Sequence, residues 1–516
     1  MRKLLAILQI FVLMAAMALP TAFAAEAPIM LAGLEAASSS SSTEAQHDWD
    51  TNLFFQTMQE KTGIAFSFTE YVSREAWTEA KTEMLAGEVA MPDMFFKAEL
   101  TPQETLAFYE AGKLIDLRPY LAEYAPHAWA LLEANPEWME AVSLPDGAIV
   151  ALPSINELTP NNTMWINKTW LDRLKMGVPT TAEELTEVLR QFRDRDMNQN
   201  GSRNDEIPLS FVSMWDLRFL AHAFGINADD YYLTEQNGKI SEVLTTEENR
   251  AFLTWLHELY TEGLLDSQGF MAMRLVEAAT SSSSSSSRET AKYGVFFGAT
   301  PQDVVGVNLA SEYIALDPLV YNGQQVYRDF TGDLYRGTFA ISSTCAEPEK
   351  LLQWVDYLYT DEGFLAAQVG KEGEDYDWND DGTWAYARTA EEVVAMQGTN
   401  TIWTTSMPSY ASAEIQMKMD DDATQALAAE LTRVRQWEKR AMPLLYLTQE
   451  QMNRVTELQS GISTYAETRM AWFVAGDVEL NDETWADFCA QVKALGIDEM
   501  VSIWQSTCDN AWHLDK

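Results

Sequence analysis

The amino-acid sequence predicts an α/β fold, in which helices cover parallel sheets in more than one domain. Short strand-like segments, IMLAGL (29–34), AFSFTEYV (65–72) and PDMFF (92–96), alternate with the helix-like segments LFFQTMQEKTG and REAWTEAKTEMLAG, and this alternation is typical of a parallel sheet. Hydrophobic residues make up 47% of the chain, as in globular rather than disordered proteins. The chain has 516 residues, far more than the ~100 to 200 that one domain usually contains, so two domains are expected.

A secretory signal precedes the folded part. Arg2 and Lys3 are followed by the apolar run LLAILQIFVLMAAMALP and by an A-x-A cleavage site that ends at Ala24, which together form the pattern of a signal peptide. The apolar run is shorter than the ~20 residues that a membrane-spanning helix needs. Residues 1–24 are therefore predicted to be a signal peptide, and the mature chain is expected in the periplasm or the extracellular cell envelope.

The charge balance is strongly acidic. The chain carries 35 basic and 78 acidic residues, and removal of Arg2 and Lys3 with the signal leaves 33 against 78, a net charge of −45. Such a field repels polyanions. Nucleic acid and anionic membranes are therefore not expected as partners.

A second domain should begin after about residue 155. The turn dipeptide DG precedes the apolar run AIVALP, and a domain crossing is expected near Pro153–Glu157. Thr181 and Glu184 then have the spacing of a capping box, at the start of a helix that should end at about Arg195, and IPLSFV (207–212) has the composition of a strand. Two consecutive helical stripes are expected near the C-terminus; they contain Trp485, Phe488, Val492 and Leu495, and Val501, Trp504 and Cys508.

Cysteines and serines add few constraints. The three cysteines, Cys345, Cys489 and Cys508, exclude a disulfide scaffold. Cys489 and Cys508 lie on the two C-terminal stripes, so a bridge between them stays open, although packed helices often hold Cα atoms beyond bonding range. The runs Ser38–Ser42 and Ser281–Ser287 are low-complexity segments and are expected to be flexible loops.

One loop, DMNQNGSRNDEIPLS (196–210), is rich in side-chain oxygen. The residues that match positions 1, 3, 5 and 6 of an EF-hand loop are Asp196, Asn198, Asn200 and Gly201. The carbonyl of Ser202 falls at position 7, but position 12 is Ile207 instead of Glu, and Asp205 and Glu206 come one or two places earlier. From spacing alone, a calcium loop and a metal-free Asn/Gly-rich surface turn are equal alternatives.

A second partial match occurs in DYDWNDDG. Its residue at position 12 is Arg388, which cannot serve as a calcium ligand. This segment is predicted to be a hairpin turn.

One long segment, TMWINKTWLDRLKMGVPTTAEELTEVLRQFRDRDMNQNGSRNDEIPLSF, resembles the extracellular solute-binding proteins, family 1, which deliver saccharides to ABC importers. Further matching pieces follow in order along most of the mature chain; they are NLFFQTMQEKTGI, MPDMFF, GKLIDLRPYLAEYAPH, GTFAISSTCAEPEKLLQWVDYLYTDEGFLAAQVGKEGEDYDW and ETWADFCAQVKALGIDEMVSIWQ. The resemblance implies a type II periplasmic binding protein fold, in which a hinge joins two α/β lobes and a ligand cleft lies between them.

In this fold, residues 25–155 and 315–388 would form the N-terminal lobe, and residues 156–314 with a helical part, 389–516, would form the C-terminal lobe. The implied function is that of a monomeric receptor, not an enzyme, which captures an oligosaccharide and delivers it to the transmembrane subunits of an ABC importer. Many relatives carry a lipidated cysteine after the signal; LPTAFAAEA has none, so no lipid anchor is expected.

The resemblance also favours calcium, because alginate-binding relatives hold this ion in a similar D-x-N-x-N-G stretch. The ligands that it implies for Ca²⁺ are Asp196, Asn198, Asn200, Ser202, Glu206 and either Asn204 or Asp205. An ion between the end of a helix and the start of a strand stabilises that connection, so its expected role is structural.

The ligand site should combine aromatic rings, which stack on the apolar faces of sugars, with side chains that bond pairs of hydroxyls. The candidates lie at predicted strand ends or at the domain crossing; they are Trp49, Asp50, Asp93, Asn156, Glu157, Trp165, Trp215, Phe297, Arg336, Tyr376 and Trp378. Arg336 is the best cation for a ligand carboxylate, with a structural ion pair as the alternative. The acidic field favours a neutral oligosaccharide over a uronate polymer.

Two other classes of protein fit parts of the sequence. A secreted carbohydrate-active enzyme would use paired carboxylates as acid and base, but acidic residues are too abundant for any pair to stand out, and HExxH, GxSxG and P-loop motifs are absent from the sequence. An envelope interaction protein would use its acidic surface and serine loops to bind macromolecules. Turnover of an oligosaccharide would identify the enzyme, and ligand-dependent stabilisation without turnover the receptor.

Overall fold

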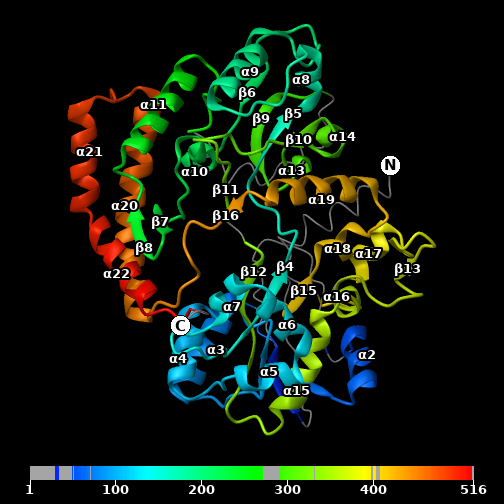
Figure 1. Ribbon diagram of the computed structural model, residues 1–516. Coiled ribbons are helices and arrows are strands. Elements are labelled where there is room, and N and C mark those ends of the chain that lie inside the picture. Colours follow the sequence, from blue (N-terminus) through cyan, green and yellow to red (C-terminus); the bar gives the residue numbers. More distant parts are fainter. Residues whose placement is uncertain are drawn as a thin grey trace.

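Two sheets form the centres of two lobes in the computed structural model (Figure 1). The structure describes residues 29–33, 49, 51–69, 71, 73–270, 290–329, 332–396, 399–402 and 407–513. The predicted signal peptide and both serine runs lie outside these residues. No helix in these ranges is long and apolar enough to cross a membrane.

The first lobe is built on a six-stranded sheet with the order β15-β4-β12-β3-β1-β2. Its strands are β1 Ile29–Gly33, β2 Phe66–Thr69, β3 Met94–Phe96, β4 Leu152–Asn156, β12 Leu334–Ile341 and β15 Ser409–Ala411. They run parallel except for β12, which is antiparallel to both β3 and β4. Because β4 leads directly into the second lobe, the carboxyl ends of the five parallel strands all face that lobe.

Both faces of this sheet are buried. Met94 and Phe96 of β3 contribute to one apolar cluster, and Phe95 between them contributes to another, as the alternation of side chains along a strand requires. The helices of this lobe are α2 Leu53–Thr62, α3 Arg74–Ala86, α4 Pro102–Glu110, α5 Arg118–Tyr124, α6 Pro126–Ala134, α7 Pro136–Val142, α15 Pro348–Asp356, η4 Tyr357–Tyr359, α16 Asp361–Gln368, α17 Ala390–Met396 and α18 Ala413–Met417.

The second lobe is built on a four-stranded sheet with the order β10-β5-β9-β6. Its strands are β5 Thr163–Asn167, β6 Ile207–Leu209, β9 Tyr293–Gly298 and β10 Tyr313–Ala315. Strand β5 is antiparallel to β9 and β10, and β6 is parallel to β9. Because β5 enters this lobe from the first one, the carboxyl ends of β6, β9 and β10 face the first lobe.

Helices and one hairpin complete the second lobe. They are α8 Lys168–Leu174, α9 Ala182–Asp194, α10 Met214–Leu217, η1 Arg218–Phe224, β7 Leu233–Gln236, β8 Lys239–Glu242, α11 Glu247–Thr261, α13 Pro301–Val305, α14 Val307–Ala310, α19 Asp422–Arg435, α20 Gln449–Ala475, α21 Asp482–Ala494 and α22 Ile497–Asp509. Helix α9 begins as predicted, since Thr181 accepts a hydrogen bond from the Glu184 amide at 3.2 Å; the Glu184 carboxylate, however, accepts from Thr180 at 2.8 Å.

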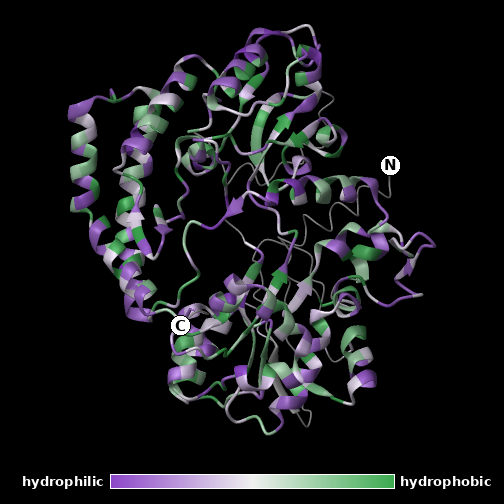
Figure 2. Cartoon of the chain, in the orientation of Figure 1, coloured by the Kyte–Doolittle hydropathy of each residue, from purple (hydrophilic) through white to green (hydrophobic). Residues whose placement is uncertain are grey.

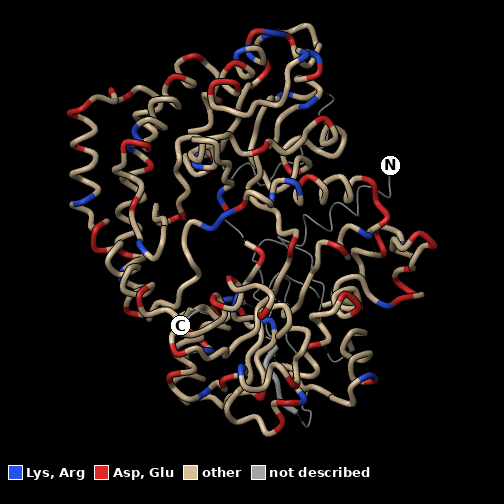
Figure 3. Tube along the Cα trace, in the orientation of Figure 1, with Lys and Arg blue, Asp and Glu red and all other residues tan. Residues whose placement is uncertain are grey.

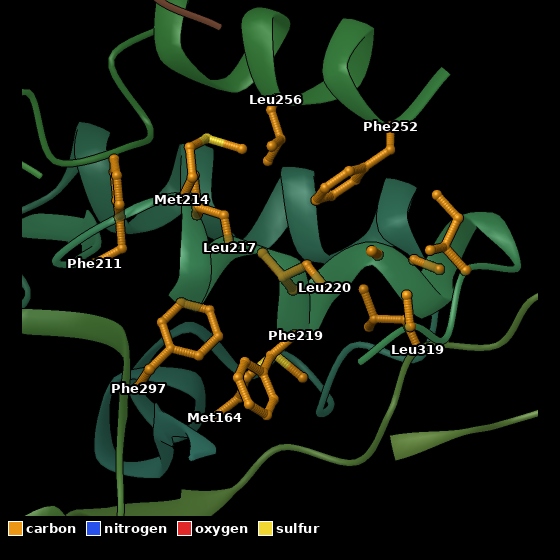
Figure 4. Close-up of a cluster of buried hydrophobic side chains, with 14 of the residues drawn as sticks. Met164, Phe211, Met214, Leu217, Phe219, Leu220, Phe252, Leu256, Phe297 and Leu319 are labelled. Atoms are coloured by element: carbon orange, nitrogen blue, oxygen red, sulfur yellow. The ribbon is translucent and has the colours of Figure 1, made fainter. Parts of the chain in front are cut away.

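One apolar core runs through the second lobe from its sheet to the C-terminal helices. Figure 4 shows part of this core, in which Leu256 and Phe252 of α11 lie on one side of the helical segment that carries Leu217 and Leu220, and Phe219 and Phe297 lie on the other side. Figure 2 shows apolar positions concentrated inside both lobes. The two predicted C-terminal stripes are confirmed as α21 and α22. Cys489 and Cys508 on these helices are not joined by a disulfide.

Two local expectations have different outcomes. The hairpin in DYDWNDDG is confirmed, because β13 Tyr376–Trp378 pairs antiparallel with β14 Trp384–Tyr386. The assignment of residues 389–516 to the C-terminal lobe does not hold for α17, β15 and α18, which belong to the first lobe; β15 pairs with β4 in its sheet. Three residues of strand carry too little pattern to reveal which sheet they join.

Candidate functional site

The two sheets present their strand carboxyl ends to one another. In open α/β sheets, ligands bind outside these ends. We define the interlobe face as the residues at the carboxyl ends of β1–β4 and β15 in the first lobe and of β6, β9 and β10 in the second, together with the segments that connect the lobes (Figure 1). This face is the candidate functional site.

Connecting segments from distant parts of the chain are tied together between the lobes. Strand β11 Tyr327–Arg328 pairs in parallel with β16 Glu438–Lys439. The side-chain amide of Asn161 donates to the Arg328 carbonyl at 2.7 Å and to the Glu438 carboxylate at 3.2 Å. These contacts join three chain segments into one hinge.

Acidic and basic residues lie close together along the connecting segments of the hinge (Figure 3). Arg435 donates to the Glu157 carbonyl and forms an ion pair with Asp333 at 2.5 Å, and Arg440 lies 3.5 Å from Asp329. Burial, with the nearby Asp329 carboxylate, raises the pKa of Glu438 to about 7. Ionisation of a carboxyl group with so high a pKa lowers the stability of the folded protein.

A cavity of about 420 Å³ lies beside the hinge and is bounded by both lobes. Three aromatic residues, Trp138, Tyr446 and Trp512, contribute to its wall. The charged and histidine residues in the wall are Glu137, Glu140, Glu235, Asp329, Asp333, Arg435, Glu438, Lys439, Arg440 and His513. Aromatic surface next to hydrogen-bonding groups suits a ligand with both apolar faces and hydroxyls.

The chain just after β3 has an unusual backbone. Lys97 and Glu99 have φ angles of 55° and 48°, a left-handed conformation that costs a residue with a side chain about 1–2 kcal/mol. The Lys97 ammonium lies 5.1 Å from the centre of the buried Trp49 ring, and Glu99 lies 3.5 Å from the Arg74 guanidinium. Such strain concentrates at functional sites, and here it lies at the interlobe face.

The predicted residues Asn156 and Glu157 lie at the carboxyl end of β4, as expected from the crossing. The Asn156 side-chain oxygen accepts from the Leu158 amide at 2.9 Å and from Gln416 at 3.0 Å, and the Glu157 carboxylate accepts from the Ala413 amide at 2.8 Å. Both side chains therefore also hold the connection between β4 and helix α18.

Trp215 lies beyond the carboxyl end of β6 in a polar network. Its indole N–H donates to Asp230 at 2.9 Å, and Asp230 pairs with Arg328 at 2.5 Å. The Arg328 guanidinium also lies 5.7 Å from the centre of the Trp215 ring. The network fixes an aromatic ring and two charged groups at the interlobe face of the second lobe.

Other predicted ligand residues lie elsewhere. Trp49, Trp165, Phe297 and Tyr376 are buried in the cores. Arg336 is enclosed 4.7 Å from the centre of the Tyr446 ring and donates to the Leu445 carbonyl at 3.2 Å. Its role is therefore structural, but through an aromatic ring and main-chain carbonyls instead of the ion pair considered as its alternative.

Three further predicted ligand residues do not lie at the interlobe face of the described structure. Asp93 precedes β3, at the sheet edge opposite the interlobe face, where its carbonyl accepts from Ser342 at 3.0 Å. Trp378 lies on the β13–β14 hairpin with 40% of its surface exposed. Asp50 lies outside the described residues. The predicted strand PDMFF ends at Phe96, so the strand-end rule would also have found Lys97 and Glu99, had it been applied to the residues that follow this strand.

The oxygen-rich loop folds around its own acidic residues. The Met197 amide donates to the Glu206 carboxylate at 2.7 Å, and the side-chain amides of Asn198 and Asn200 approach one oxygen of Asp205 at 3.2 and 2.5 Å. The main-chain amides of this loop also bond Asp196, Asn198, Asn200 and Ser202.

Two oxygens in this loop fit a cation. The second carboxylate oxygens of Asp205 and Glu206 are buried and accept no hydrogen bond from the described residues, an arrangement that costs free energy unless a positive group is present. Within the described ranges, no three His, Cys, Asp or Glu side chains form a metal site by themselves. An ion here therefore needs the amide and hydroxyl oxygens as well.

No family model matches the chain. The fructooligosaccharide ABC transporter substrate-binding protein FusA of Streptococcus pneumoniae serotype 4 is 24% identical over 509 residues, which cover 91% of this chain and 89% of FusA. The chain is a homologue of ABC-transporter substrate-binding proteins. The FusA complex with kestose has a TM-score of 0.64 at 22% identity, covering 93% of this chain and 99% of that one.

A second solved structure has the same fold. An extracellular solute-binding protein from Bifidobacterium longum subsp. infantis has a TM-score of 0.74 at 21% identity, covering 94% of this chain and 98% of that chain. The predicted two-lobed periplasmic binding protein fold is therefore correct. The homologues are substrate-binding proteins and not enzymes, and substrate-binding proteins of ABC importers work outside the cytoplasm.

Proposed function

We propose that this protein is an extracytoplasmic receptor that binds an oligosaccharide between its lobes and presents it to the transmembrane subunits of an ABC importer. The observation that carries the proposal is the interlobe face, where the carboxyl ends of both sheets meet around a hinge. A ligand that contacts both lobes favours the closed form, because only that form provides all its contacts.

The chemistry of the interlobe face supports a saccharide as ligand. Trp215, Asn156 and Glu157 combine an aromatic ring with amide and carboxylate groups, and Trp215 and Arg328 are both held by Asp230. FusA carries the name of a fructooligosaccharide-binding protein, and another relative by fold is described as binding human milk oligosaccharides. We propose a neutral oligosaccharide for this chain, in a monomeric receptor.

The test is a thermal-unfolding screen with kestose, nystose, a human milk tetrasaccharide and a mannose oligosaccharide. We expect at least one of them to raise Tm without being hydrolysed, since a ligand at 100 times its Kd stabilises a protein by about 2.7 kcal/mol. Chromatography of the recovered sugar checks for cleavage. Release of fragments would instead support a carbohydrate-active enzyme, and saturable cell-wall binding without any sugar response would support an envelope interaction protein.

We also propose that the loop at residues 196–206 holds one structural Ca²⁺. The hard side-chain oxygens of the loop and the two buried carboxylate oxygens support this proposal, as do relatives by fold that are described as a FusA EF-hand mutant and as AlgQ2 without calcium ion. The residues that would hold the ion are Asp196, Asn198, Asn200, Ser202, Asn204, Asp205 and Glu206. The ion supplies positive charge that links the end of α9 to the start of β6.

Removal of calcium tests this second proposal. We expect a chelator to lower Tm by an amount equivalent to about 2–3 kcal/mol, as for an ion present at 100 times its Kd, and calcium, rather than magnesium, to restore it. The double variant Asp205→Asn/Glu206→Gln should no longer respond. The control is Asp381→Asn in the β13–β14 turn, which should respond like the wild type; an equal loss in both variants would contradict the assignment.

A further inference from the structure

An exposed aromatic ring lies at the interlobe face, apart from the residues named above. Tyr335, at the start of β12, has 45% of its surface exposed, whereas neighbouring Leu334 and the central residues of the strand are buried. Because β12 is antiparallel to its neighbours, its amino end lies at the same sheet edge as the carboxyl ends of β3 and β4. The ring therefore belongs to the face that the second lobe opposes.

A bulge in β12 accounts for the exposure of this ring. The pairing of β12 with β4 shifts between Tyr335 and Phe339, and a bulge of this kind redirects side chains, often beside functional sites. Gly337 within it has φ +74°, and a Cβ atom there would lie 2.0 Å from the Leu100 carbonyl oxygen. The Leu100 amide donates to the Gly337 carbonyl at 2.9 Å, so the bulge is fixed against the segment that follows β3.

The same segment supplies polar groups. Glu99 and Arg74 form an ion pair at 3.5 Å, and Glu99 is one of the residues that the backbone holds in a left-handed conformation. The Arg74 side chain is 70% exposed and that of Glu99 is 17% exposed. Arg74 opens helix α3, which follows β2, while α4 begins just beyond Glu99. An ion pair of this kind offers a donor and an acceptor to adjacent hydroxyls.

We propose that Tyr335 is a platform on which one ring of the saccharide stacks, while Arg74 and Glu99 bond the hydroxyls of that ring. The inference rests on the proposed function and specifies the first-lobe contact. A sugar has apolar C–H faces that pack on an aromatic ring and equatorial hydroxyls that need paired donors and acceptors. The balanced charge of Arg74 and Glu99 suits a neutral sugar unit.

Isothermal titration calorimetry with kestose, nystose and a human milk tetrasaccharide tests the platform. For the probe that binds the wild type most tightly, we expect Tyr335→Ala to weaken binding about tenfold or more, as for loss of an aromatic contact at the centre of an interface. Tyr335→Phe retains the stacking surface and should stay within about threefold of the wild type. Glu99→Gln, which leaves Tyr335 unchanged, should also weaken binding of the saccharide.

The matched control is Trp472→Ala. Trp472 is an aromatic residue of similar exposure, 44%, on α20 of the second lobe, and its loss should not change affinity. An affinity of Tyr335→Ala within twofold of the wild type would overturn the platform and leave the proposed function intact. If the wild type bound none of the probes, the proposed function would fail and the platform with it. Unchanged thermal unfolding of Tyr335→Ala, without ligand, separates lost contact from lost folding.

Discussion

Gly337→Ala should lower the free energy of unfolding by about 3 kcal/mol or more. The backbone of Gly337 has φ +74°, which costs a residue with a Cβ atom about 1–2 kcal/mol. The new methyl group would also lie 2.0 Å from the Leu100 carbonyl oxygen, and relief of such overpacking costs about 1–3 kcal/mol. Equilibrium unfolding in urea, monitored by tryptophan fluorescence, measures the loss.

Gly323→Ala provides the matched control for this prediction. Gly323 has nearly the same backbone angle, φ +77°, but a Cβ atom there would meet no heavy atom within 4 Å. Gly323→Ala should therefore lower the free energy of unfolding only by the conformational cost, about 1–2 kcal/mol. If both variants lost the same free energy of unfolding, the bulge of β12 would accommodate the methyl group without strain. That result would contradict the close contact between Gly337 and Leu100.

Glu438→Gln should stabilise the protein at pH 8 by up to about 3 kcal/mol. Burial, together with Asp329, raises the pKa of Glu438 from 4.5 to about 7, and each pKa unit corresponds to about 1.4 kcal/mol. In the wild type, the folded state takes up a proton below pH 7 and the unfolded state only below about 4.5. The ionised group therefore destabilises the fold fully above pH 7, and this penalty disappears as the pH falls towards 4.5.

The measurement compares the free energies of unfolding of variant and wild type between pH 5 and pH 8. We expect the difference to be below about 1 kcal/mol at pH 5 and to grow through neutral pH. Asn161, Arg435 and Asp333 face the same carboxyl group and are unchanged in the variant. The control is Glu450→Gln, an exposed residue at the start of α20, for which the difference should stay within about 0.5 kcal/mol. A constant difference for Glu438→Gln would refute the shifted pKa.

Local patterns in the sequence predicted the fold well. The alternation of strand-like and helix-like segments identified β1, β2 and β3, and the spacing of Thr181 and Glu184 located the start of α9 within a residue. These features depend on neighbouring residues only. Placement of β15 in the first sheet depends on a pairing with β4 across more than 250 residues of chain, for which three residues provide no signal.

The candidate site was predictable only in part. Asn156, Glu157 and Trp215 follow strands and lie at the interlobe face, because the strand-end rule needs only the order of elements. The rule misplaced Asp93, which precedes β3 instead of following it. Tyr335 was not foreseen, since its exposure results from a bulge, and neither was the hinge pairing of Asp333 with Arg435, since it joins segments a hundred residues apart.

The strand order of the first lobe also governs when the chain can acquire its structure. Its sheet contains residues 29–33 from near the beginning and Ser409–Ala411 from far along the chain, so no stretch synthesised early contains the whole sheet. A nascent chain of three hundred residues lacks β12 and β15, the two neighbours of β4 in the sheet, and leaves both edges of β4 unpaired. Because the sheet of the first lobe is complete only after Ser409–Ala411 has been synthesised, the chain cannot finish folding early. An incompletely folded chain can still pass through a translocation pore.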